Sequence, residues 1–93
     1  MQVLLFTILN CVACNAHRKE LTTLSREFGF DLRVFDVDDP NNFHLVLKAM
    51  QKHDLMKTPS LVLLDENREP LLTLQGIPNS IETLKRKLYE ERH

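Results

Sequence analysis

An apolar run near the start of the chain, Val3 to Leu9, leads almost directly into two cysteines that stand three positions apart. The run is broken only by Thr7 and has polar flanks, which is typical of a strand buried on both faces at the centre of a sheet. A helix is expected to open at Cys11 and to end before Gly29, which suits a C-cap. The cysteine pair is therefore predicted at the junction between a central strand and a helix.

The rest of the chain predicts three more strands and two more helices. The strands are expected over Leu32–Val37, Ser60–Leu64 and Leu71–Leu74, and the helices from Asn41 to about His53 and after a cap at Ser80. Asp39 is the candidate N-cap of the middle helix, with Pro40 at its first position. The polar stretch Asp65 to Glu69 is turn-like and predicts an antiparallel hairpin.

Apolar side chains recur at helical spacing and indicate which face of each helix packs inward. They are Cys14, Leu21, Leu24 and Phe28 in the first helix, Phe43, Val46, Leu47 and Met50 in the second, and Ile81, Leu84 and Leu88 in the third. The element order β-α-β-α-β-β-α predicts one α/β domain over residues 1–93. Its centre is a four-stranded mixed sheet with helices on both faces.

Composition narrows the classes of function. The chain has 93 residues with 12 Lys and Arg against 13 Asp and Glu, whereas proteins that neutralise nucleic-acid phosphates usually carry a basic excess. The N-terminus has no basic leader, and its apolar run is too short to span a membrane. We therefore expect no nucleic-acid partner, no membrane association and a cytoplasmic location, with the chain acting as a monomer.

The spacing Cys11-Val12-Ala13-Cys14 favours dithiol–disulfide chemistry. Residues i and i+3 on a first helical turn are close enough for a disulfide to join them. The unpaired N–H groups and positive dipole of a helix start stabilise a thiolate at the first cysteine. Cys11 is thus the expected nucleophile, and Cys14, one turn on, the resolving thiol that closes the Cys11–Cys14 disulfide.

The two cysteines also have alternative uses. They can be two small buried residues without chemistry, as free cysteines often are. With His17 they form Cys-x2-Cys-x2-His, which supplies three of the four ligands of a usual zinc site, and a module binding metal or acting as an adaptor is the alternative function. His17 is otherwise expected to be an exposed helix residue, near enough to tune a thiolate. A copper-chaperone fold is disfavoured, because a helix separates the second and third predicted strands.

A second element, Thr58-Pro59, directly precedes a buried strand, where proline marks a special geometry. Together with the cysteine motif, Gly76 and the element order, it makes the whole chain resemble the thioredoxin superfamily, and especially its small glutaredoxin-like members. The resemblance implies the thioredoxin fold, a cis Thr58–Pro59 bond and a thiol–disulfide oxidoreductase that reduces protein disulfides with no cofactor besides its own disulfide. It implies catalytic roles for Cys11 and Cys14 and substrate contacts for Val12, Ala13, Thr58 and Pro59.

Departures from the family pattern bear on the type of redox protein. The chain contains no Trp, and Leu5 stands where thioredoxins carry a buried acid that is thought to help the resolving thiol. Glutaredoxins hold glutathione with a Gly-Gly-Asp stretch, whereas this chain has a lone Gly76 followed by Ile77-Pro78. The electron donor, either a reductase or glutathione, is therefore left open.

Overall fold

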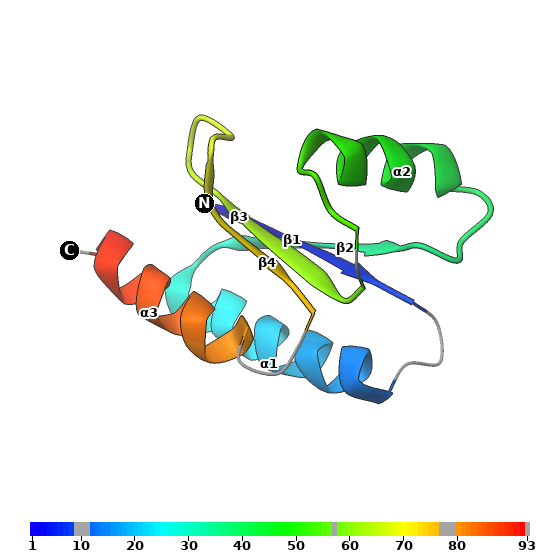
Figure 1. Ribbon diagram of the computed structural model, residues 1–93. Helices are drawn as coiled ribbons and strands as arrows, with labels where there is room; N and C mark the ends of the chain where they lie inside the picture. The colour runs from blue at the N-terminus through cyan, green and yellow to red at the C-terminus, as the bar shows by residue number, and fades with distance from the viewer. Residues whose placement is uncertain (9–11, 57, 77–79, 93) are drawn as a thin grey trace.

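The computed structural model describes residues 1–8, 12–56, 58–76 and 80–92 (Figure 1). Within these ranges the elements run in the order β-α-β-α-β-β-α, as predicted. They are β1 (Gln2–Thr7), α1 (Val12–Phe28), β2 (Asp31–Asp36), α2 (Phe43–Lys52), β3 (Ser60–Leu64), β4 (Pro70–Gln75) and α3 (Ser80–Arg92).

The four strands form one mixed sheet in the order β2-β1-β3-β4. β1 runs parallel to β2, with Leu5 opposite Val34, and antiparallel to β3, with Leu5 opposite Leu61. β3 and β4 form the expected antiparallel hairpin. Every residue from Val3 to Thr7 is buried, because β1 has a strand on each side and a helical layer on each face. The prediction that the first apolar run is a central strand is confirmed.

Side chains alternate along the inner strands and so divide the core into two layers. α1 and α3 cover one face of the sheet, and α2 covers the other (Figure 1). The buried residues of the first layer are Val3, Leu5, Leu21, Leu24, Phe30, Leu61, Leu63, Ile81, Leu84 and Leu88. Those of the second layer are Leu4, Phe6, Val46, Leu55, Val62 and Leu64.

Among the described side chains, which exclude that of Cys14, the inner faces of α1 and α3 are those predicted from the helical spacing. Leu21 and Leu24 of α1 are buried, as are Ile81, Leu84 and Leu88 of α3. The backbone N–H of Gly29, whose φ is 73°, donates to the carbonyl oxygen of Ser25 at 2.8 Å, which confirms the expected C-cap. No helix among the described residues combines the length and apolar character that a membrane span requires.

The start of α2 differs from the prediction. The helix begins at Phe43, its N-cap is Asn42, and the Asn42 side chain makes no capping hydrogen bond. The Asp39 carboxylate instead accepts hydrogen bonds from the backbone N–H of Asn41 at 3.0 Å and from Nδ2 of Asn42 at 2.9 Å. Because Asp39 bonds to groups that directly follow it, it stabilises a turn around Pro40 and delays the helix by two residues.

The buried face of α2 is also narrower than predicted. Val46 is 1% exposed, but Phe43 and Leu47 are 47% and 44% exposed. The residues that pack on the sheet are Val46, Ala49 and Met50, so the helix is rotated away from the predicted apolar face. Leu55, just beyond the helix, is buried in the same layer.

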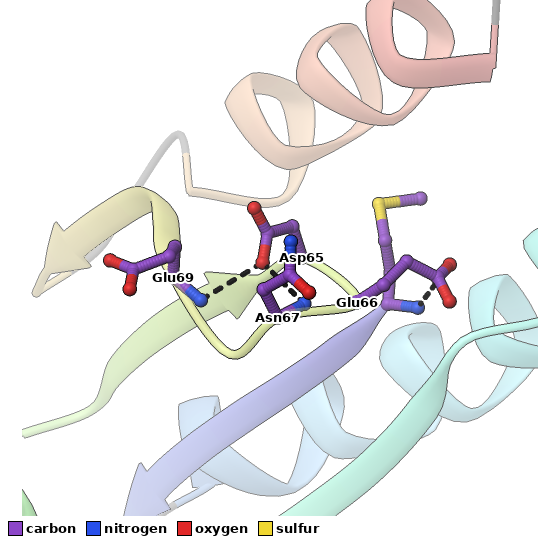
Figure 2. A network of polar contacts seen from close by, with 5 residues as sticks. Asp65, Glu66, Asn67 and Glu69 are labelled. Atoms are coloured by element: carbon purple, nitrogen blue, oxygen red, sulfur yellow. Dashed lines mark hydrogen bonds and ion pairs between the residues drawn. The ribbon is translucent and has the colours of Figure 1, made fainter.

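The carboxylate of Asp65 stabilises the turn between β3 and β4. Oδ1 of Asp65 accepts the backbone N–H groups of Asn67 at 2.8 Å and Glu69 at 2.9 Å, as Figure 2 shows. Beside it, the amino group of Met1 lies 3.4 Å from Oε1 of Glu66. The sequence-based turn is therefore confirmed, and it also tethers the start of β1.

Strand ends shift by one or two residues from the expected ranges. β1 ends at Thr7, so Ile8 lies beyond the strand, and Leu9 is outside the described residues. β2 begins and ends one residue earlier than predicted, and β4 extends by one residue at each end. The backbone N–H of Val37 still donates to the carbonyl oxygen of Thr7 at 2.8 Å, which holds the two strand ends together.

Candidate functional site

The two cysteines stand where β1 gives way to α1. Cys11 lies outside the described residues, between the end of β1 and the start of α1 at Val12. Cys14 is in the first turn of α1, and the side chains of residues 12–14 are also outside the description. The predicted junction is thus present in the backbone, while the roles of the cysteines and of Val12 and Ala13 stay predictions.

The Thr58–Pro59 bond is cis, as the resemblance implied. Both residues are half-buried, and β3 begins directly after them at Ser60. The carbonyl oxygen of Pro59 accepts the backbone N–H of Gly76 at 2.8 Å. The end of β4 therefore fixes the position of Pro59 at the start of an inner strand.

A crevice joins this proline to α1. Its lining residues are Leu5, His17, Pro59, Ser60, Leu61 and Gly76, and it has no room for a water molecule. His17 is half-buried here, not exposed as the sequence suggested. The spacing 14-17-21-24 carried the signal, since it puts His17 on the same face of α1 as Leu21 and Leu24.

The strand position that matches the buried acid of thioredoxins is part of the core. Leu5 is 1% exposed and packs with the layer under α1 and α3. It gives the crevice an apolar wall, and Ser60, Leu61, Pro59 and Gly76 add no charge. His17 is consequently the titratable residue of the crevice among the described residues.

A carboxylate lies on the same face of the sheet. Asp36, at the end of β2, is paired in register with Thr7 of β1. Leu32 packs against the layer under α1 and Phe35 against the layer under α2, so alternation directs Asp36 towards α1. Its Oδ1 is buried without a hydrogen-bond partner among the described residues. Asp36 does not line the crevice.

Sequence reasoning missed Gln75, the last residue of β4. Its Oε1 accepts the backbone N–H of Met56 at 2.8 Å, and its Nε2 donates to the carbonyl oxygen of Asp54 at 3.4 Å. Leu55 between them is buried, whereas Met56 is 88% exposed. Gln75 therefore clamps the segment that leads into Thr58 across 19 to 21 positions, and no local pattern in the sequence marks it.

The metal alternative is not tested by the described side chains. They contain no group of three His, Cys, Asp or Glu residues that could hold a metal ion. The side chains of Cys11 and Cys14 are outside that set, so the ligand group proposed with His17 stays an alternative.

Comparison with known proteins shows which fold the chain has. No family model and no curated protein matches the chain. Thioredoxin 1 of Thermosipho africanus is similar over 100% of both chains, with a TM-score of 0.74 and 20% identity. Thioredoxin O2 of Arabidopsis thaliana is similar over 96% of this chain and 72% of its own, with a TM-score of 0.77 and 18% identity.

Mitochondrial thioredoxin 3 of Saccharomyces cerevisiae is also similar. The match covers 96% of this chain and 76% of the yeast chain, with a TM-score of 0.72 and 17% identity. At such identities the likeness concerns the path of the backbone. It confirms the fold that the resemblance implied and leaves the chemistry to be argued from the residues.

Proposed function

We propose that this chain, which has the thioredoxin fold, is a thiol–disulfide oxidoreductase that reduces protein disulfides through Cys11 and Cys14. The observation that carries the proposal is the crevice in which His17 of α1 meets Pro59. α1 is the helix at whose start the two cysteines stand, so its second turn and the cis-proline segment are neighbours. A dithiol at that helix start, beside a fixed backbone segment, suits exchange with an extended substrate.

The proposed reaction follows from the order of the two cysteines in the chain at the start of α1. The Cys11 thiolate attacks a substrate disulfide, forms a mixed disulfide and releases one substrate thiolate. Cys14 then attacks the Cys11 sulfur, which closes the Cys11–Cys14 disulfide and releases the second substrate thiolate. A reductase or glutathione returns two electrons. Thr58 and Pro59, with Val12 and Ala13, contact the substrate chain in this proposal.

Single cysteine variants test the proposal in an assay of insulin disulfide reduction. Cys11→Ser should abolish reduction, because it removes the attacking thiolate. Cys14→Ser should accumulate a mixed disulfide with the substrate, and it should react with iodoacetamide at neutral pH faster than Cys11→Ser does. Equal reactivity of the two variants would contradict the assigned roles. Zinc released on titration of the wild-type thiols would favour the metal-binding alternative.

The electron donor is tested in the same assay. The lone Gly76 lacks the following residues with which glutaredoxins hold glutathione. Thioredoxin reductase should therefore support turnover at least several times faster than glutathione with glutathione reductase. Equal or faster turnover with glutathione would overturn this choice while leaving the oxidoreductase proposal intact.

A further inference from the structure

The resolving step of the proposed reaction creates a demand for a proton acceptor. A cysteine attacks a disulfide as the thiolate, and an ordinary thiol, with a pKa of about 8.5, is mostly protonated at neutral pH. Cys14 lies in the first turn of α1, which covers the sheet face that holds Leu5. Leu5 offers no proton acceptor on that face, and of the described residues that line the crevice beside it His17 is the titratable one.

His17 is placed to meet this demand. It follows Cys14 by three positions within one continuous helix, so the two residues share a face of α1. The His17 side chain is half-buried and lines the crevice with Pro59. An imidazole exchanges its proton near neutral pH, which matches a thiol better than a carboxylate does.

Among the described residues, no charged group within the crevice competes with His17 as the acceptor of a proton. The described residues that line the crevice with it from β1 and β3, and from the ends of the hairpin, carry no charge. Arg18 and Glu20, its charged neighbours on α1, are exposed. Asp36 points to the same layer from β2 but does not line the crevice, so it is the rival acceptor.

We propose that His17 accepts the thiol proton of Cys14 during resolution of the mixed disulfide. The proposal rests on the oxidoreductase function argued above. As the Cys14 S–H bond breaks, the proton moves to the imidazole, and the sulfur forms a bond to the sulfur of Cys11. The bond between Cys11 and the substrate breaks, and its electron pair leaves with the substrate thiolate, which takes a proton from the imidazolium or from solvent.

Fast mixing of the reduced protein with an equimolar amount of dithiobis(nitrobenzoate) separates the two steps. Attack by Cys11 releases one coloured thiolate, and resolution by Cys14 releases the second. His17→Gln should leave the first rate within about twofold and slow the second at least tenfold at neutral pH, a threshold below the roughly 10²- to 10⁴-fold that a positioned base contributes. The deficit should shrink at alkaline pH, where Cys14 ionises unaided. His17→Asn should behave alike and serves if the Gln variant does not fold.

Two further variants make the result specific. His44→Gln changes an exposed histidine of α2 and should leave both rates unchanged. Asp36→Asn should slow the second release by less than about threefold. A larger effect in Asp36→Asn than in His17→Gln would overturn the proposal, as would a loss in His17→Gln that is independent of pH or equal in both steps. A wild type that releases no second thiolate would instead refute the oxidoreductase function.

Discussion

At the scale of single residues, the region around Thr58 and Pro59 depends on polar contacts made by the end of β4. Gly76 donates its N–H to Pro59, and Gln75 binds the backbone of Asp54 and Met56. Asp54 has a φ of 55°, which a non-glycine residue rarely adopts. The contacts that hold the chain on both sides of Asp54 therefore help to keep this backbone conformation. The buried Leu55 anchors the segment and leaves the Met56 side chain in solvent.

Replacing Gln75 with Ala should loosen this segment more than it destabilises the protein. The hydrogen bonds are exposed, so the free energy of unfolding should fall by about 1 kcal/mol or less. Amide hydrogen exchange at Met56 should accelerate markedly, because its N–H loses its acceptor. Gln51→Ala, an exposed site on α2, is the matched control. Unchanged exchange at Met56 would show that Gln75 does not hold the segment.

At the scale of elements, the helical layers bury different amounts of apolar surface. Among the described side chains, α1 and α3 together contribute five buried ones to their layer, namely Leu21, Leu24, Ile81, Leu84 and Leu88. α2 contributes Val46 as its buried residue, with Ala49 and Met50 partly buried against the same layer. Phe43, Leu45 and Leu47 leave much of their surface in solvent. The attachment of α2 to the sheet thus depends on few contacts.

Paired substitutions in α2 test this asymmetry. Val46→Ala should lower the free energy of unfolding by about 2 kcal/mol, because it leaves a cavity in the core. Leu47→Ala removes a larger side chain but should cost less than about 1 kcal/mol, since Leu47 is 44% exposed. Urea unfolding measures both. A larger loss in Leu47→Ala would restore the apolar face predicted from the sequence and contradict the observed rotation of α2.

At the scale of the whole molecule, one histidine links folding to pH. His53 follows α2 at the end of the sheet where Met1 and the hairpin turn meet. Burial of the ring, with a smaller effect of the Lys52 charge, holds the pKa of His53 below its usual 6.5. The folded protein therefore takes up this proton at a lower pH than the unfolded chain does.

The lowered pKa of His53 sets the direction in which the free energy of unfolding changes with pH. Just below pH 6.5 the unfolded chain binds a proton at His53 that the folded protein does not yet bind, so stability falls as pH falls. His53→Gln should flatten the fall in the free energy of unfolding between about pH 7 and pH 5. His44→Gln, at an exposed site, should not. An unchanged slope in His53→Gln would show that His53 contributes nothing to it.

Features that depend on a local pattern of residues could be predicted from the sequence. The apolar run from Val3 to Leu9 predicted that β1 is central, the order of predicted strands and helices indicated the mixed sheet, and Gly29 predicted the end of α1. The cysteine spacing located the candidate site at a strand–helix junction. Each of these follows from neighbours in the chain, because burial on two faces, helical spacing and a left-handed cap leave their mark within a few residues.

The helix face that meets the sheet, and the distant groups that meet each other, depend on the packing of the folded chain. Asp39 bonded to the groups that follow it and not to a helix beginning at Pro40, and α2 packed on the sheet through Val46, Ala49 and Met50. His17 came to lie beside Pro59, and Gln75 beside Met56, through contacts across about 40 and 19 positions. Such contacts depend on how packed layers settle against one another, and a local pattern of residues does not encode that geometry.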